Sequence, residues 1–146
     1  METFTLGDVI PPEHEFEDAA QLRAALRRFL SRSEQISREH GLTPERYQLL
    51  LMIKVSPEDT ATVGSLSKTL AIGQSAATQL VRRAEDLGLL ERTLSRRDAR
   101  VHPLRLTNEG EKRLRATLAE LGPERTALLA ALHDLEPAGP AQGESL

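Results

Sequence analysis

Residues 62–88 contain two short helical patterns that meet at Gly73, and this arrangement constrains the fold more than any other part of the chain. Thr62 is a residue type that caps helix N-termini, and apolar residues follow it at positions 63, 66, 70 and 71. Beyond Gly73, apolar residues recur at positions 77, 80, 81, 84 and 87, and Gly88 ends the pattern. Two short helices joined by a tight turn, the second with a polar outer face, are typical of a helix-turn-helix.

Two runs of alternating apolar and polar residues follow and flank a charged turn. "LLERT" begins at Leu89, "VHPLRL" ends at Leu106, and "LSRRDA" lies between them. This pattern predicts a hairpin whose tip carries Arg96, Arg97, Asp98 and Arg100. Such a turn could be an ordinary solvated hairpin, but directly after a helix-turn-helix it favours contact with a negatively charged partner.

Longer helical patterns lie on both sides of this middle part. The apolar spacing predicts one helix over 16–40 and a second that begins after Thr43 and contains the apolar run "LLLMI", which indicates a central, buried helix. Thr107 is expected to cap a further helix, and we expect Gly122 and Pro123 to separate it from a last one. The outer helices carry more apolar surface than the middle part could cover, which predicts a partner subunit. The residues expected at that interface are Leu22, Leu26, Phe29, Leu118, Leu121, Leu128 and Leu132.

The composition and the charge distribution exclude several classes of protein. The chain has no cysteine, which excludes disulfides and thiolate metal sites, and its longest apolar run is too short to span a bilayer, so we expect a cytoplasmic protein. The net charge is −3, yet residues 68–106 hold eight Lys/Arg against four acids, so a basic segment sits in an acidic chain. Aromatic residues make up only 3%, which disfavours single-stranded nucleic acid and leaves duplex as the better partner.

No catalytic or cofactor-binding pattern is present in the sequence. "GQSAA", which begins at Gly73, imitates a nucleophile elbow, but it follows no strand and has Ala77 where that motif needs glycine. The four histidines, at positions 14, 40, 102 and 133, lack the spacing of metal ligands. We therefore expect neither an enzyme nor a bound cofactor.

Several segments resemble the MarR family (multiple antibiotic resistance regulators). The resemblance runs from Leu42 to Leu114 and rests on four fragments in the same order and at the same spacing. These are Leu42-Thr43, Glu85…Gly88…Leu90…Arg92, Asp98-x-Arg100 and Leu106-Thr107…Gly110. Two positions depart from the family pattern: Ala84 stands where leucine is common, and Pro103 falls inside an expected strand, where it is tolerated only at an edge.

The resemblance implies a mainly α (α+β) fold, a winged helix-turn-helix with flanking N- and C-terminal helices that form a dimerisation domain. The expected division is an extended arm (1–15), a helical dimerisation region (16–40 and 107–136), a DNA-binding lobe (41–106) and a flexible tail (137–146). Proteins of this family are homodimeric transcription factors that bind a pseudo-palindromic double-stranded operator. They usually repress, and many release DNA when a small aromatic or phenolic effector binds.

The family's DNA contacts can be transferred to this chain by position. The side chains expected in the major groove are Gln74, Ser75, Thr78, Gln79 and Arg82. Arg100 would enter the minor groove from the wing and Asp98 would brace the wing arginines, while the expected backbone contacts are Arg96, Arg97, Lys68 and Arg83. The side-chain chemistry agrees, because Gln and Arg read base edges and an arginine suits a narrow, electronegative minor groove.

Two other interpretations remain open at this point. A winged helix can serve as a protein–protein assembly module, in which case the wing arginines would pair with an acidic partner surface. A metal-sensing regulator is also possible, because some MarR-like proteins sense zinc and a dimer could bring distant histidines together.

Overall fold

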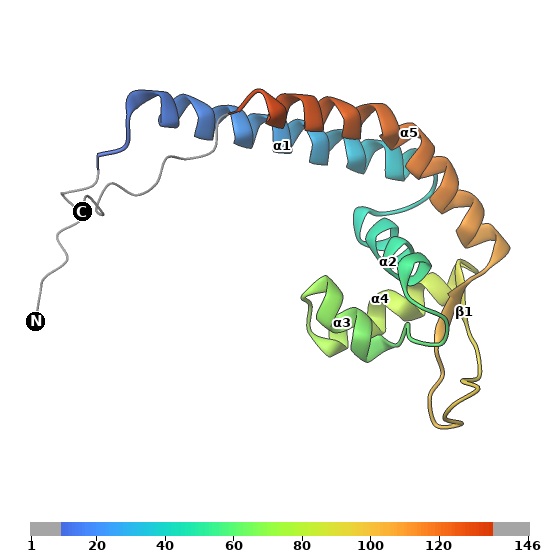
Figure 1. Cartoon of the computed structure of the whole chain (residues 1–146). Coiled ribbons are helices and arrows are strands. Elements are labelled where there is room, and N and C mark those ends of the chain that lie inside the picture. The colour runs from blue at the N-terminus through green and yellow to red at the C-terminus, as the bar shows by residue number, and fades with distance from the viewer. Residues whose placement is uncertain (1–9, 136–146) are drawn as a thin grey trace, which may run out of the picture. The chain divides into compact units, whose positions relative to one another are not determined.

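The computed structural model describes residues 10–135, which form five helices and a two-stranded antiparallel sheet (Figure 1). The elements are α1 (Glu13–Glu39), α2 (Pro44–Val55), α3 (Val63–Leu70), α4 (Gln74–Asp86), β1 (Leu90–Arg92), β2 (Leu104–Leu106) and α5 (Asn108–His133). This order confirms the mainly helical fold with a small hairpin that the sequence predicts. The expected extended arm lies partly, and the expected tail wholly, outside the described residues.

The first helix begins earlier than its apolar pattern indicates. It starts at Glu13 rather than at residue 16, because Glu13 and Glu15 in the first turn favour the positive end of the helix without adding to the apolar stripe. The amide of Glu15 bonds to the carbonyl of Pro12 at 3.0 Å, so a proline precedes the first turn. The helix therefore begins before the first residue of its apolar pattern, where acidic side chains stabilise the first turn.

The expected break at Gly122 and Pro123 is wrong, because α5 runs through both residues as one helix. A proline removes one amide donor, here the one that would meet the carbonyl of Ala119. Ala119 is exposed, so this carbonyl can bond to water, and strong helix formers on both sides support the remaining turns. Residues 10–135 consequently form five helices and not the six expected.

Contacts divide the chain into two compact units, one formed by the described residues 10–32 and 123–135 and the other by 33–122. The second unit is larger than the lobe expected over 41–106, because it includes the end of α1 and the first half of α5. The residues responsible are buried: Ile36 and Ser37 at 2% and 0% exposed, and Leu114 and Thr117 at 3% and 0%.

The larger unit is held by an apolar core to which nearly every element contributes. Its members are Leu42, Leu49, Leu50, Ile53, Ala61, Leu66, Val81, Ala84, Leu89, Leu90, Leu104 and Leu114. The buried side of α2 confirms the central position expected for that helix, and Ala84, at 0% exposed, brings the α4 backbone close to its neighbours. Leu87, expected on the buried face of α4, is instead 49% exposed, because the helix ends there and Leu89 and Leu90 fill the core.

The hairpin pairs Leu90 with Leu106 and Arg92 with Leu104, so each strand has only three residues. Pro103 lies just outside β2, which removes the difficulty of a proline in a strand. It is buried, and its carbonyl accepts bonds from the amide and the hydroxyl of Thr93 at 2.7 and 3.1 Å. Proline thus ends the ladder but still ties the two sides of the wing together.

The start of α5 is attached directly to the end of the helix-turn-helix. The amide of Thr107 bonds to the carbonyl of Leu89 at 3.1 Å, and its hydroxyl both donates to the carbonyl of Gly88 at 2.5 Å and accepts from the amide of Gly110 at 3.1 Å. A Cβ atom on Gly110 would lie 1.9 Å from the Leu89 carbonyl oxygen. Only glycine fits at this position.

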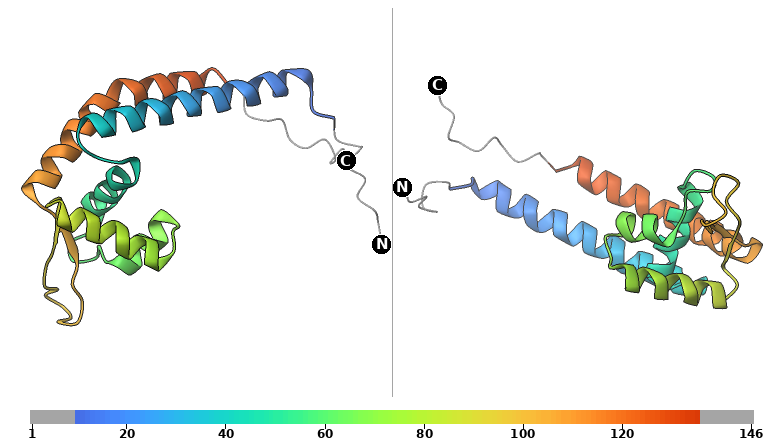
Figure 2. Two further views of the ribbon diagram at one scale, coloured as in Figure 1. Left: turned by 180° about the vertical axis from the view of Figure 1, so that it is seen from behind. Right: turned by 90° about the horizontal axis from the view of Figure 1, so that it is seen from below.

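The smaller unit is a pair of helical segments, from α1 and α5, that run side by side in opposite directions (Figures 1 and 2). Arg32 and Glu124 join them by an ion pair of 3.2 Å, and Ala25 is buried between them. Several large apolar side chains of this pair stay exposed: Phe16, Leu22, Leu26, Leu30 and Leu129.

Replacement of Gly110 tests the attachment of α5. We expect Gly110→Ala to lower the free energy of unfolding by at least about 3 kcal/mol, because the backbone of Leu89 must move to admit the methyl group. Urea unfolding followed by circular dichroism measures this change. Gly64→Ala is the matched control, since Gly64 also lies in the first turn of a helix and has space around it, so that variant should be unchanged or up to about 1 kcal/mol more stable. Equal stability of the two variants would contradict the close approach.

Candidate nucleic-acid interface

Helix α4 has one buried face and one polar, solvent-exposed face. Ala77, Val81 and Ala84 anchor it in the core at 1%, 0% and 0% exposed. The exposed side chains of the opposite face are Gln74, Ser75, Gln79, Arg82 and Arg83. Its first amides have no side-chain cap, since Gly73 occupies the N-cap position. The helix therefore presents donors, acceptors and two cations to solvent along one side.

Thr78 differs from the other residues of this face. It is only partly exposed, and its hydroxyl donates a hydrogen bond to the carbonyl of Gln74 at 2.9 Å. The hydroxyl proton is thus already used within the helix, which leaves an acceptor lone pair and a methyl group for an outside partner.

The turn before α4 fixes the direction of the helix. Ala71 adopts a left-handed conformation with φ of 54°, and its amide bonds to the carbonyl of Lys68 at 3.2 Å. Ser67 closes the turn, since its hydroxyl donates to the carbonyl of Ile72 at 2.7 Å. Lys68 itself is exposed at the end of α3 and adds a cation beside the turn.

The tip of the wing is organised around Asp98. One carboxylate oxygen of Asp98 accepts from the backbone amide of Arg100 at 3.0 Å and from its side-chain Nε at 3.2 Å. Ser95 supports the same turn by accepting from the amides of Arg97 and Asp98. The Arg100 side chain is 91% exposed, and Arg96 and Arg97 are exposed as well. Asp98 therefore braces Arg100, whereas only the backbone of Arg97 is held.

The electrostatics of the tip follow from the same contacts. Hydrogen bonds from the backbone amide and then the side chain of Arg100 lower the pKa of the Asp98 carboxyl from its ordinary value of 3.8. Asp98 is thus ionised at neutral pH, and the Arg100 guanidinium has an acceptor on one edge only. Its other donors remain directed to solvent.

Two arginines of the basic segment pair with nearby acids. Arg92 contacts Glu85 at 3.0 Å, and Arg105 contacts Glu91 across the hairpin at 2.7 Å. Both arginines count toward the positive charge of residues 68–106, but that count alone does not predict their pairing. One of the two ion pairs could have been predicted from the register of the hairpin, because that register places Glu91 opposite Arg105. Within residues 68–106, the cations for which the structure shows no ion pair are Lys68, Arg82 and Arg83 in the helix-turn-helix and Arg96 and Arg97 at the wing tip, whereas Arg100 pairs with Asp98.

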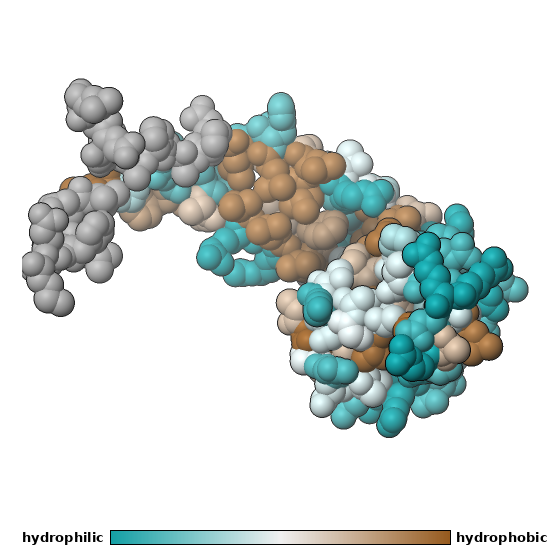
Figure 3. Space-filling view, turned by 60° about the horizontal axis from the view of Figure 1, so that its bottom comes forward, coloured by the Kyte–Doolittle hydropathy of each residue, from teal (hydrophilic) through white to brown (hydrophobic). Residues whose placement is uncertain are grey.

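The residues expected at a subunit interface fall into three groups by their exposure. Leu22 and Leu26 are each 39% exposed on the helix pair, and Phe29, Leu118, Leu128 and Leu132 are partly buried. Leu121 is only 3% exposed, because it packs within its own chain. Brown apolar side chains gather over α1 and α5 in Figure 3.

The described residues contain neither a cluster of metal ligands nor a helix that could span a membrane. Between residues 10 and 135 no three His, Asp or Glu side chains come together as metal ligands, and His40 instead contacts Glu120 at 2.9 Å. No helix in the same range has the length and apolar character needed to cross a membrane.

Comparison with known proteins relates part of the chain to one family. Residues 40–101 match a family model described as MarR family, which confirms the resemblance found in the sequence. Comparison with curated proteins gave no match. Among solved structures, the MepR–DNA complex of S. aureus is similar with 20% identity and a TM-score of 0.65, over 77% of this chain and 82% of that chain.

Two further structures share the fold. The YusO protein of Bacillus subtilis is 24% identical over 83% of each chain, with a TM-score of 0.60. The transcriptional regulator Tm0710 of Thermotoga maritima is 27% identical over 82% of each chain, with a TM-score of 0.61. These likenesses confirm the predicted fold class, a winged helix with flanking helices.

Acid titration tests the brace at the wing tip. Because the pKa of Asp98 is lowered in the folded protein, its bonds to Arg100 should be fully present above pH 3.8 and be lost only as the pH falls through the lowered pKa. The Arg100 amide resonance should therefore stay constant between about pH 5 and 8 and shift in more acid solution. Asp98→Asn, which cannot ionise, should remove that shift. Titration of the Arg100 amide near neutral pH in the unaltered protein would contradict the brace.

Proposed function

We propose that this chain, which carries the winged helix of the MarR family, is a dimeric regulator of transcription that binds double-stranded DNA sequence-specifically in the cytoplasm. The observation that carries the proposal is the polar face of α4 next to a wing whose arginine is braced by Asp98. Both elements rest on one core, so their exposed groups are held in a fixed arrangement.

The chemistry of α4 suits the major groove. Glutamine side chains can pair with both edge groups of adenine, and arginine with those of guanine, so Gln74, Gln79 and Arg82 are the side chains proposed to read bases. Ser75 and Thr78 can serve bases or phosphates, although Thr78 offers only an acceptor and a methyl group. Lys68 and Arg83 flank the face and would neutralise phosphates.

The wing suits the neighbouring part of the duplex. Arg100 has most of its donors free and its backbone fixed, which favours insertion into a narrow minor groove. Arg96 and Arg97 would contact phosphates. The similar S. aureus MepR structure is a complex with DNA, and this likeness in fold supports the same kind of partner here.

Exposed leucines on the helix pair support a homodimer. Leu22 and Leu26 of α1 leave apolar surface in water that a second copy would cover. A two-fold dimer would present two α4 helices to major grooves about one helical turn apart, which fits a pseudo-palindromic operator. We further propose that the protein represses and that a small aromatic or phenolic effector relieves repression, as the family resemblance implies.

Gel shifts with genomic fragments at moderate salt test the proposed function. Arg100→Ala should weaken binding to operator and random DNA alike and flatten the dependence of log K on log salt by about one unit, because one phosphate or groove contact is lost. Arg125→Ala is the matched control, since it removes an exposed arginine from the helix pair and should leave the slope unchanged. An absence of shifted fragments, with or without added aromatic compounds, would favour a protein–protein assembly module.

The oligomeric state provides a separate test. Leu26→Glu should raise the dimer dissociation constant by more than about a hundredfold, because an unpaired carboxylate would have to be buried in the interface. Sedimentation equilibrium measures the mass, and circular dichroism checks that the variant folds. Leu87→Glu alters another partly exposed leucine, 49% exposed in the winged-helix unit, and should remain dimeric. A monomeric unaltered protein would refute the proposed dimer.

A further inference from the structure

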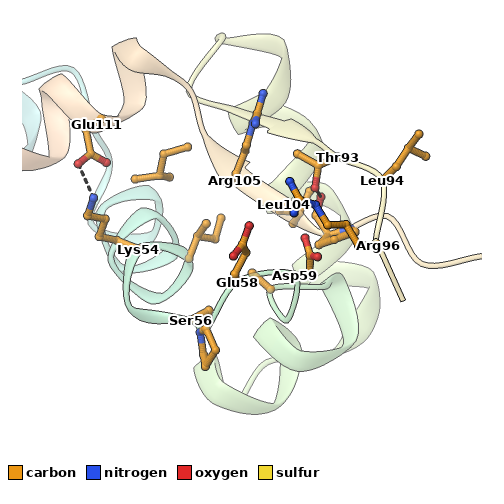
Figure 4. Close-up of a pocket in the computed structure, with 15 residues that line it drawn as sticks. Lys54, Ser56, Glu58, Asp59, Thr93, Leu94, Arg96, Leu104, Arg105 and Glu111 are labelled. Carbon is orange, nitrogen blue, oxygen red and sulfur yellow. Dashed lines mark hydrogen bonds and ion pairs between the residues drawn. The ribbon is translucent and has the colours of Figure 1, made fainter. Parts of the chain in front are cut away.

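A cavity of about 420 Å³ lies at the root of the wing, apart from the polar face of α4 (Figure 4). One wall is the end of α2 with the loop after it, the other is the wing next to Thr93 and Leu94, and Glu111 of α5 lies at one end. This volume falls within the range of small-molecule sites in proteins.

The cavity has an apolar floor that does not depend on mobile side chains. Ile53, Ala61 and Leu104 are 6%, 3% and 5% exposed, and Pro103 is buried beside them. The amide of Leu104 bonds to the carbonyl of Ala61 at 2.7 Å, which ties the loop to the strand. A compact apolar group could therefore rest on a surface that is already formed.

Three of the six charged residues that line the cavity take part in ion pairs. Lys54 pairs with Glu111 at 2.5 Å, and Arg105 pairs with Glu91 at 2.7 Å. Glu58, Asp59 and Arg96 also line the cavity, and among the residues that the structure describes none of these three takes part in an ion pair. Among the lining groups without an ion pair, two carboxylates stand against one guanidinium, whereas the six charged residues of the lining together balance.

The backbone strengthens this negative character. Helix α2 ends at the cavity with Ile53, Lys54 and Ser56, and the C-terminal end of a helix is electronegative. Asp59 has a φ of 63°, a conformation that aspartate tolerates better than most residues. The turn before it is closed by the hydroxyl of Thr60, which donates to the carbonyl of Pro57 at 2.6 Å. These contacts fix the backbone of the loop that carries Glu58 and Asp59.

We propose that this cavity binds an organic ammonium ion with a compact apolar body. The ammonium group lies against Glu58 and Asp59, and the apolar body rests on Ile53, Ala61 and Leu104. Arg96 is exposed and its long side chain can turn toward solvent, so it does not oppose the ligand's charge. Arg96 belongs both to the lining and to the proposed phosphate contacts, but binding of an ammonium ion can be measured without DNA.

Three probes of similar size and different charge test the proposal: 2-phenylethylammonium, 2-phenylethanol and phenylacetate. Each is titrated into the full chain, and amide resonances are followed by two-dimensional NMR. The ammonium probe should shift the resonances of Asp59, Thr93 and Leu104 in a saturable way. The alcohol should bind at least about fivefold more weakly, and phenylacetate should not bind there. Equal binding of the three probes, preference for the anion, or no saturable shift at these residues overturns the proposal.

Two variants each remove one negative charge from the cavity and keep the size of the side chain. Asp59→Asn keeps a residue type that accepts the positive φ, and Glu58→Gln keeps the length of the side chain; each should weaken the ammonium probe about fivefold. Glu45→Gln, at the other end of α2, removes an exposed acid and should leave binding unchanged. Unchanged binding in both cavity variants contradicts the site. Gel shifts by the same proteins report the proposed DNA function separately, so either proposal can fail alone.

Discussion

The close approach of Gly110 to the carbonyl of Leu89 is the contact on which the rest of the winged-helix unit depends. At this point α4 has just ended, β1 is about to begin, and α5 starts after β2, so three elements meet through backbone atoms. Thr107 bonds to both Gly88 and Leu89 and then caps α5. A side chain at position 110 would separate these elements, and the wing and α4 would no longer share one fixed frame.

That frame also determines which cations can reach a partner. Arg92 and Arg105 lie on the hairpin strands, where Glu85 and Glu91 neutralise them, so they stabilise the wing rather than extend its reach. Arg100 lies beyond the ladder and is 91% exposed, with only one edge held by Asp98. Position in the hairpin therefore separates structural arginines from those available to bind, a distinction that net charge does not make.

The sequence correctly predicted the helix ends that depend on local side-chain and backbone chemistry. Thr43 and Thr62 cap their helices as expected, and Gly88 ends α4 with a φ of 72°. The continuation of α5 through Pro123 was missed, because a proline inside a helix costs about 3 kcal/mol and this cost is offset here by the other turns of a long helix. The exposure of Leu87 and the burial of Leu121 were missed too, since periodicity gives the face of a helix but not where its neighbours stop. The proposed roles of the α4 and wing residues stay predictions, because side-chain chemistry alone does not identify a ligand.

Helix α2 links the core to the cavity at the wing root. Its buried residues Leu49 and Leu50 contribute to the apolar core, whereas Ile53, one turn further, is part of both the core and the cavity floor. The bond between Leu104 and Ala61 joins that floor to β2, and Pro103 next to it holds Thr93 on the other side of the wing. A molecule seated on the floor therefore contacts both sides of the wing at its base. The strands that leave this base carry the wing tip, where Asp98 holds one edge of Arg100 and the rest of that side chain is exposed.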